Sequence, residues 1–172
     1  IHFVKPEEIE DRSLAIIEEE LKAKNAFHRW SPGEYAVVRR CIHTSADFEY
    51  ADQLYFSDGA VETALRAIKD GAHIITDTKM AASGINKKRL SVFEGQVHCF
   101  MDDPQVAREA KARGITRSAV CMERGSQVEG KKIFAVGNAP TALIRLYELI
   151  REGKVQPELI IGVPVGFVNV VE

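Results

Sequence analysis

The chain has 172 residues, the length of one globular domain that can bury a sizeable core. Its residues are 45% hydrophobic and 28% charged, which excludes the compositions of disordered, collagen-like and coiled-coil proteins. Lys and Arg total 23 against 25 Asp and Glu, with the two signs interspersed, so we expect no binding to nucleic acid. We therefore expect a single domain over residues 1–172.

Cysteine usage and hydropathy favour a cytoplasmic location. The three cysteines are odd in number, lie far apart and form no CxxC pair, as is usual in a reducing compartment. No apolar run approaches the ~20 residues of a membrane span, and no charged segment leads into a signal-type apolar stretch. We therefore expect no association with a membrane.

The first part of the chain predicts helices. Residues 6–8 (Pro-Glu-Glu) favour a helix start. Residues 31–34 (Ser-Pro-Gly-Glu) form a capping-box pattern that opens a second helix, expected to end at about His43. Ser57 and Asp58 can cap a third helix, which Gly71 would end. An apolar stripe on the first helix consists of Ile9, Ile16, Ile17 and Leu21.

Short apolar strands then alternate with helices. The predicted strands are 72–76, 96–101, 132–136 and 159–163, and the predicted helices between them are 104–113 and 141–151. A turn-rich stretch covers residues 83–91. Because parallel strands need crossover connections, this order predicts an α/β fold with a doubly wound parallel sheet and helices on both of its faces.

In such sheets, ligands bind beyond the carboxyl ends of the strands. Candidate segments are 77–79, 102–103, 137–141 and 164–167, although Asp102 and Asp103 are better explained structurally, with Asp103 as the N-cap before Pro104. The segment Gly137–Thr141 leads into a helix N-terminus, where N–H groups and the helix dipole favour an anion, although a plain tight turn explains it equally well. Asp77 could position a base or a metal ion, or could simply cap a turn. No P-loop or dinucleotide-binding motif follows any predicted strand.

A metal site is not expected, because the five histidines show no HxxxH or HxH spacing. His43 differs from the others, since it falls at the C-terminus of a capped helix, where the negative end of the dipole favours the imidazolium. That position suits a general acid. The alternative is a histidine that only caps the last helix carbonyls.

Three segments resemble those of the precorrin-8X methylmutases of cobalamin biosynthesis. They are Val38–His43 (VRRCIH), Gly137–Leu143 (GNAPTAL) and Gly162–Val168 (GVPVGFV). Supporting stretches in the same order are Ile9–Ser13, Ala72–Met80 and Thr116–Ser118, so the resemblance runs along nearly the whole chain. Relatives of this kind continue past Glu172, so we expect a C-terminal part of the family's domain beyond this sequence.

The resemblance implies a flavodoxin-like fold, a homodimer and an isomerase that moves a methyl group from C11 to C12 of precorrin-8X or cobalt-precorrin-8. The histidine that matches His43 is implied as the catalytic residue, protonating or hydrogen-bonding a ring nitrogen. No cofactor is implied, and no role falls to Cys41, because tautomer selection and electrostatic stabilisation replace a covalent intermediate.

The implied substrate is a flat macrocycle ringed by carboxylates, which calls for an apolar surface with cationic and hydroxyl groups at its rim. The residues that we expect to bind it are Arg12, Ser13, Arg40, Asp77, Thr116, Arg117, Ser118, Asn138 and Thr141. Two other functions stay open. One is a non-catalytic corrinoid-binding homologue, and the other is a flavodoxin-like domain that binds a phosphate-bearing ligand at residues 137–141.

Overall fold

The computed structural model describes residues 5, 8–23 and 29–166. Its chain forms two compact units, Ile1–Glu62 and Thr63–Glu172. The helix start predicted at Pro6 and Glu7, and the Phe167 and Val168 positions of the third family segment, lie outside the described residues.

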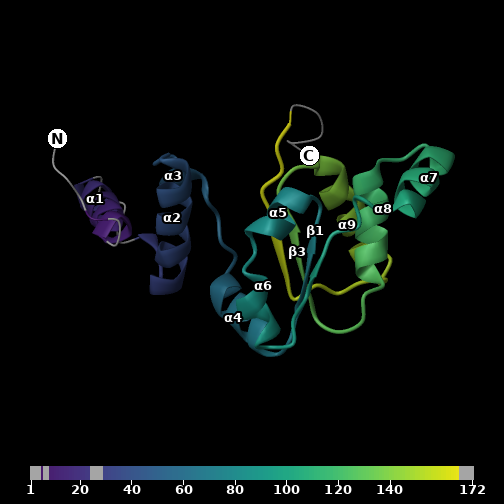
Figure 1. Ribbon diagram of the computed structural model, residues 1–172, viewed down its shortest axis with the longest axis horizontal. Coiled ribbons are helices and arrows are strands. Elements are labelled where there is room, and N and C mark those ends of the chain that lie inside the picture. Colours follow the sequence, from purple (N-terminus) through teal and green to yellow (C-terminus); the bar gives the residue numbers. More distant parts are fainter. Residues whose placement is uncertain (1–4, 6–7, 24–28, 167–172) are drawn as a thin grey trace. The chain divides into compact units, whose positions relative to one another are not determined.

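The first unit is helical, with α1 (Ile9–Ala23), α2 (Pro32–Ser45) and α3 (Tyr50–Gln53) labelled in Figure 1. Its core forms where Ile17 and Leu21 of α1 meet Val38 and Ile42 of α2, all buried. These residues are spaced four apart on each helix, which places each pair on one face. The rest of the expected stripe is not core, because Ile9 and Ile16 are 55% and 52% exposed.

The capping box predicted for α2 is present. The Glu34 N–H donates to Ser31 Oγ at 3.3 Å, and the Ser31 N–H donates to Glu34 Oε2 at 2.8 Å. These bonds satisfy two of the N–H groups that a helix start leaves without partners. The helix continues to Ser45, two residues beyond the predicted end at His43.

The second unit is built on a parallel four-stranded sheet of β1 (His73–Thr76), β2 (Val97–His98), β3 (Lys132–Val136) and β4 (Leu159–Gly162). The strand order is β2-β1-β3-β4, and every neighbouring pair is parallel. This is the order of the first four strands of a flavodoxin-like sheet.

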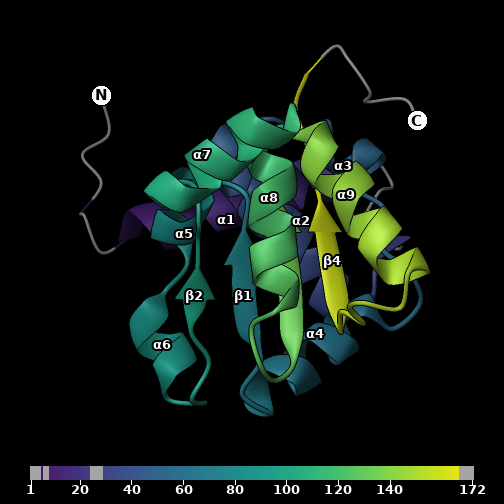
Figure 2. The same ribbon diagram turned by 90° about the vertical axis from the view of Figure 1, so that its right-hand side faces the viewer.

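Both faces of this sheet carry helices, as a parallel sheet requires. Ile75, Phe134 and Val136 are fully buried beneath α7 (Pro104–Arg113), α8 (Arg117–Ser126) and α9 (Pro140–Arg151), which cover the near face in Figure 2. On the other face, Ala67 and Ile68 of α4 (Ala60–Lys69) pack with Ile74, Ile133 and Leu159. The predicted doubly wound α/β class is therefore confirmed.

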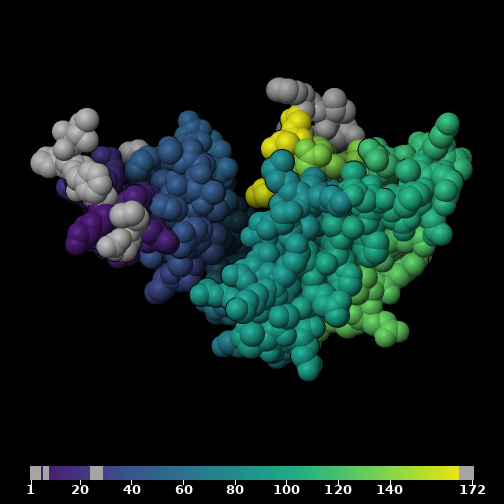
Figure 3. Space-filling model, in the orientation of Figure 1, coloured from purple at the N-terminus to yellow at the C-terminus, as the bar shows by residue number. Residues whose placement is uncertain are grey.

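Three features of this unit differ from the sequence prediction. Strand β2 is shorter than the expected 96–101, because the chain leaves the sheet in a turn in which the Asp103 N–H donates to the Phe100 carbonyl at 3.1 Å. The region around the turn-rich stretch contains the short helices α5 (Lys79–Gly84) and α6 (Lys87–Ser91). Atoms of the segment that contains them, coloured teal, lie at the surface of the sheet unit in Figure 3. Helix α8, capped by Thr116, was not predicted.

Across the residues that the structure describes, no helix combines the length and the apolar character needed to cross a bilayer.

Gly125 tests the packing of α8 on the sheet. A Cβ at this buried position would lie 2.5 Å from Ile75 Cγ2 and 3.3 Å from Phe134 Cε1. Gly125→Ala is therefore expected to lower the free energy of unfolding by about 2 kcal/mol, measured by urea titration. Gly84→Ala is the matched control, because a Cβ there meets nothing within 4 Å. An equal loss of stability in both variants would contradict this packing.

Candidate active site

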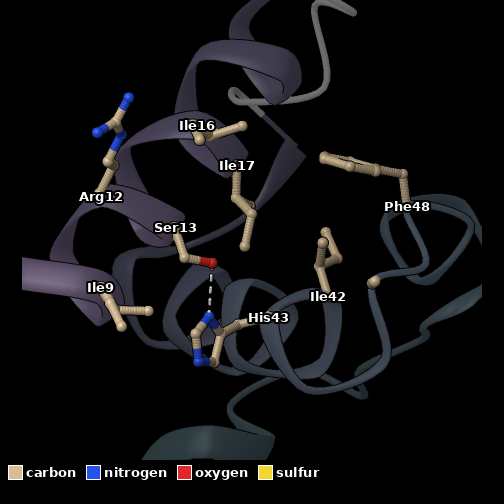
Figure 4. Close-up of a pocket in the computed structure, with 9 residues that line it drawn as sticks. Ile9, Arg12, Ser13, Ile16, Ile17, Ile42, His43 and Phe48 are labelled. Atoms are coloured by element: carbon tan, nitrogen blue, oxygen red, sulfur yellow. Dashed lines mark hydrogen bonds between the residues drawn. The ribbon is translucent and has the colours of Figure 1, made fainter. Parts of the chain in front are cut away.

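An apolar pocket lies within the helical unit, between α1, α2 and the turn that follows α2. Its volume is about 360 Å³. Figure 4 shows the residues that line it, namely Ile9, Arg12, Ser13, Ile16, Ile17, Ile42, His43, Ala46 and Phe48. The exposed Ile9 and Ile16 thus belong to the wall of this pocket, which explains why they are not covered by the core.

His43 is the only titratable group other than Arg12 among these lining residues. Its Nδ1 lies 2.8 Å from Ser13 Oγ in a half-buried hydrogen bond between α1 and α2. No described residue forms a hydrogen bond with its Nε2, so this nitrogen can meet a ligand. A hydroxyl can donate or accept, and therefore it can hold either the neutral ring or the imidazolium.

The carbonyls at the end of α2 do not use the His43 ring. Thr44 Oγ1 donates to the Arg40 carbonyl and Ser45 Oγ donates to the Cys41 carbonyl, both at 2.8 Å. The Ala46 N–H donates to the Ile42 carbonyl at 2.7 Å. The hydrogen bond described for the His43 ring leads to Ser13 Oγ and to no helix carbonyl, which argues against the capping alternative.

The turn after α2 completes the pocket. Ala46 caps the helix with a φ of 57°, a left-handed conformation that glycine usually adopts. This turn brings Phe48 back beside Ile42, and Phe48 packs against the core cluster of α1 and α2. Ala46 thus adopts a strained backbone conformation in the turn that closes the side of the pocket next to His43.

The two arginines expected at the substrate lie differently. Arg12 lines the pocket, and its guanidinium extends away from the imidazole. Arg40 does not line it, because Arg40 Nη2 donates to Glu10 Oε1 at 2.8 Å on the exposed surface of α1 and α2. This hydrogen bond holds the pKa of the Glu10 carboxyl below its ordinary value.

The carboxyl edge of the sheet holds the second group of expected residues. Asp77 follows β1 and is 1% exposed. Its Oδ1 accepts the Gly137 N–H at 3.0 Å, and its Oδ2 accepts the Asn138 and Ala139 N–H groups at 2.9 and 2.8 Å. The anion that the sequence predicts for this loop is therefore met by a carboxylate of the chain itself, which weakens the hypothesis of a phosphate site at 137–141.

Helices α8 and α9 meet at their N-termini beside this loop. Thr116 Oγ1 accepts the Ala119 N–H at 3.2 Å and donates to Thr141 Oγ1 at 3.0 Å. Ser118 is buried, whereas Arg117 and Asn138 are exposed. Arg117 forms no ion pair with any described residue and can reach solvent.

The remaining histidines and thiols of the described chain show no comparable arrangement. His73 Nδ1 and His98 Nε2 lie 3.4 Å apart, and burial together with His73 lowers the pKa of His98. Burial raises the pKa of the Cys121 thiol to about 11, so it is not a thiolate at neutral pH. In residues 8–23 and 29–166, no group of three or more His, Cys, Asp or Glu side chains is placed to hold a metal ion.

The sequence interpretation missed the apolar wall of the pocket. Helical periodicity places Ile9 and Ile16 in one apolar stripe with Ile17 and Leu21, and Ala46 and Phe48 follow the second helix without a recognisable motif. No sequence signal could have found this wall, because periodicity predicts an apolar stripe but not which of its residues line a pocket.

The parallel sheet and the histidine-bearing apolar pocket are typical of an α/β enzyme that acts on a small molecule. A family model described as precorrin-8X methylmutase matches residues 8–172. A cobalt-precorrin-8 methylmutase of Salmonella typhimurium is 41% identical over 175 residues, covering 100% of this chain and 81% of that protein. A cobalt-precorrin-8 methylmutase of Priestia megaterium is 38% identical, covering 98% of this chain and 73% of that one.

The structure is also similar to that of the precorrin-8x methyl mutase from Thermus thermophilus. The TM-score is 0.79 at 43% identity, and the match covers 94% of this chain and 76% of that one. The chain belongs to the precorrin-8X methylmutase family. It is an intramolecular methyl-transferring isomerase of cobalamin biosynthesis.

The Ser13 hydroxyl is expected to hold the His43 ring in one orientation. Ser13→Ala should lower kcat by about fivefold to tenfold with little change in KM, because one hydrogen bond worth about 1 kcal/mol is lost. The ¹⁵N resonance of His43 Nδ1 should shift in the same protein. Thr44→Ala is the control, because it removes a neighbouring hydroxyl that bonds only a backbone carbonyl. An unchanged Nδ1 resonance in Ser13→Ala would count against this hydrogen bond.

Proposed function

We propose that His43 is the general acid that assists the shift of a methyl group from C11 to C12 of precorrin-8X or cobalt-precorrin-8. The observation that carries this proposal is the Ser13–His43 hydrogen bond in an apolar pocket, with Nε2 left without a partner among the described residues. Ser13 occupies Nδ1, so the proton available to a ligand is the one on Nε2.

The proposed step conserves every atom. The Nε2–H donates to a ring nitrogen, which selects the tautomer in which the methyl group can migrate. The bond from C11 to the methyl carbon breaks as the bond from C12 forms, and the proton returns to His43. Apolar walls support this step, since a hydrogen bond or charge acts more strongly where the bound ring displaces water from them.

The pocket is small for the whole substrate. Ligand pockets generally range from about 300 to 1,000 Å³, and a corrin macrocycle with its side chains is larger than most pocket ligands. We infer that the pocket receives one edge of the ring, close to the nitrogen that His43 serves. Arg12, at the rim, is then available to a peripheral carboxylate.

Several other side chains are proposed to bind the substrate carboxylates. Arg117 is exposed and forms no ion pair with a described residue. The residue before it, Thr116, is hydrogen-bonded to Thr141 of α9. We propose the same role, binding of the substrate, for Ser118, Asn138 and Arg40. For Arg40, binding a carboxylate requires release of Glu10. For Asp77, a different role is argued below.

A homodimer in the cytoplasm is also proposed. Ile160 and Ile161 on the outer strand β4 are 40% and 46% exposed, and Val163 and Val165 after it are 50% and 63% exposed. Exposed apolar side chains of this kind favour a covering partner, for which we propose a second copy of the chain.

The dimer predicts a mass of twice 19.1 kDa in sedimentation equilibrium. Ile161→Lys should shift the protein toward monomer, because a charge at an apolar interface is not compensated. Lys154→Glu, an exposed charge reversal after α9, is the control. A monomer of the unsubstituted chain at micromolar concentration would refute the proposal.

The central prediction concerns His43 itself. His43→Ala should lower kcat by about a hundredfold to ten-thousandfold, the usual contribution of a general acid. The measurement is the change in visible absorption of precorrin-8X and of cobalt-precorrin-8, together with a titration of product binding. His98→Gln, which changes a histidine of the sheet unit, should keep its rate.

Full turnover by His43→Ala would refute the general-acid role. Tight binding of the corrin product by the unsubstituted chain, without turnover of either substrate, would instead support the non-catalytic corrinoid-binding homologue.

A further inference from the structure

The carboxylate of Asp77 is buried at the carboxyl edge of the sheet, and within the described chain it accepts hydrogen bonds from backbone N–H groups alone. Its side chain is 1% exposed, and its two oxygens accept three N–H groups from consecutive residues of the loop between β3 and α9. No ion pair joins Asp77 to a Lys or Arg of the described chain. Three charge-assisted hydrogen bonds therefore replace the hydration of this carboxylate.

The loop that Asp77 binds is connected to two further segments. The Val163 N–H donates to the Val136 carbonyl at 2.9 Å, and the Val165 N–H donates to the Asn138 carbonyl at 3.1 Å. The loop thus fixes the chain that follows β4. On its other side it leads directly into α9, whose Thr141 is hydrogen-bonded to Thr116 at the start of α8.

Asp77 is not in a position to bind a substrate carboxylate, because both are negatively charged and Asp77 is almost fully covered. The geometry therefore indicates an indirect role. We propose that Asp77 is a positioning residue that holds the 137–139 loop, and through it Thr141, Thr116 and Arg117, where they bind the carboxylates of the substrate. This inference rests on the substrate contacts proposed above for those three residues.

The chemistry of the loop makes this role specific to a carboxylate. Successive N–H groups that converge on one point form a concave anion site. An amide in place of the carboxylate keeps the volume but directs an N–H₂ group at an N–H donor, so at least one of the three bonds is lost. Asp77→Asn should therefore loosen the loop without opening a cavity.

The experiment uses the full chain with two variants. For Asp77→Asn, KM for the corrin substrate is expected to rise about tenfold while kcat stays within about threefold, since ground-state contacts are lost and His43 is untouched. Amide hydrogen exchange at residues 137–139 should become about tenfold faster or more, with exchange in β1 and β3 unchanged.

For Asp77→Ala, the vacated anion site should accept formate. Millimolar formate is expected to raise the melting temperature of this variant and lower its KM, whereas formamide, which is neutral and of similar size, should do neither. If Asp77→Ala only left a destabilising cavity, formate and formamide would have the same effect on the melting temperature and on KM.

Asp103→Asn is the matched control, because Asp103 also accepts a backbone N–H near this edge but caps α7 through one bond from Gln105 at 2.8 Å. It should leave KM unchanged. Loop exchange in Asp77→Asn equal to that of the unsubstituted chain would overturn the proposal, as would a fall in kcat at constant KM. If the unsubstituted chain turned over neither corrin substrate, the proposed function would fail, and loop exchange and formate rescue would still decide whether Asp77 anchors the loop.

Discussion

The bonds between the Asp77 carboxylate and three backbone N–H groups determine the shape of one end of the sheet unit. Parallel strands bring all of their carboxyl ends to one edge of the sheet. Each strand is followed there by a loop, whose backbone N–H and C=O groups no longer have partners in the sheet. Asp77, at the end of β1, supplies acceptors for the loop after β3, and that loop supplies the acceptor for the chain after β4. A single buried charge thereby orders three segments that are far apart in sequence.

The helical unit solves a different physical problem. A histidine serves as a proton donor only if its ring is oriented and its second nitrogen is free. Ser13 holds the His43 ring through Nδ1, and no described helix carbonyl bonds to that ring. The apolar residues around it come from α1 and α2 and from a left-handed turn at Ala46. The chemistry proposed for this chain therefore rests on one oriented imidazole with apolar side chains around it.

Each unit, taken by itself, carries features that we propose for binding a large, multiply charged ring. Isoleucines and Phe48 in the helical unit suit the flat apolar part of such a ring. Arg117 and the linked threonines of the sheet unit suit its carboxylates. Membership of the methylmutase family is consistent with both, because the segments that carry the resemblance include the His43 helix and the loop that Asp77 holds.

Much of the fold follows from local sequence signals. Some signals act over only a few residues and can be read from the sequence alone. They are the capping box at Ser31, the Asp103 and Gly114 boundaries of α7, and the apolar runs of β1 and β3. The sequence likewise predicts His43 as the candidate acid, from its place near a helix end and from the family segment. The tertiary structure alone decided which partners these groups have: Ser13 for His43, Glu10 for Arg40, and the 137–139 loop for Asp77. Those pairs are separated by 30 or more positions, and only the packing of whole helices and strands brings them within hydrogen-bonding distance.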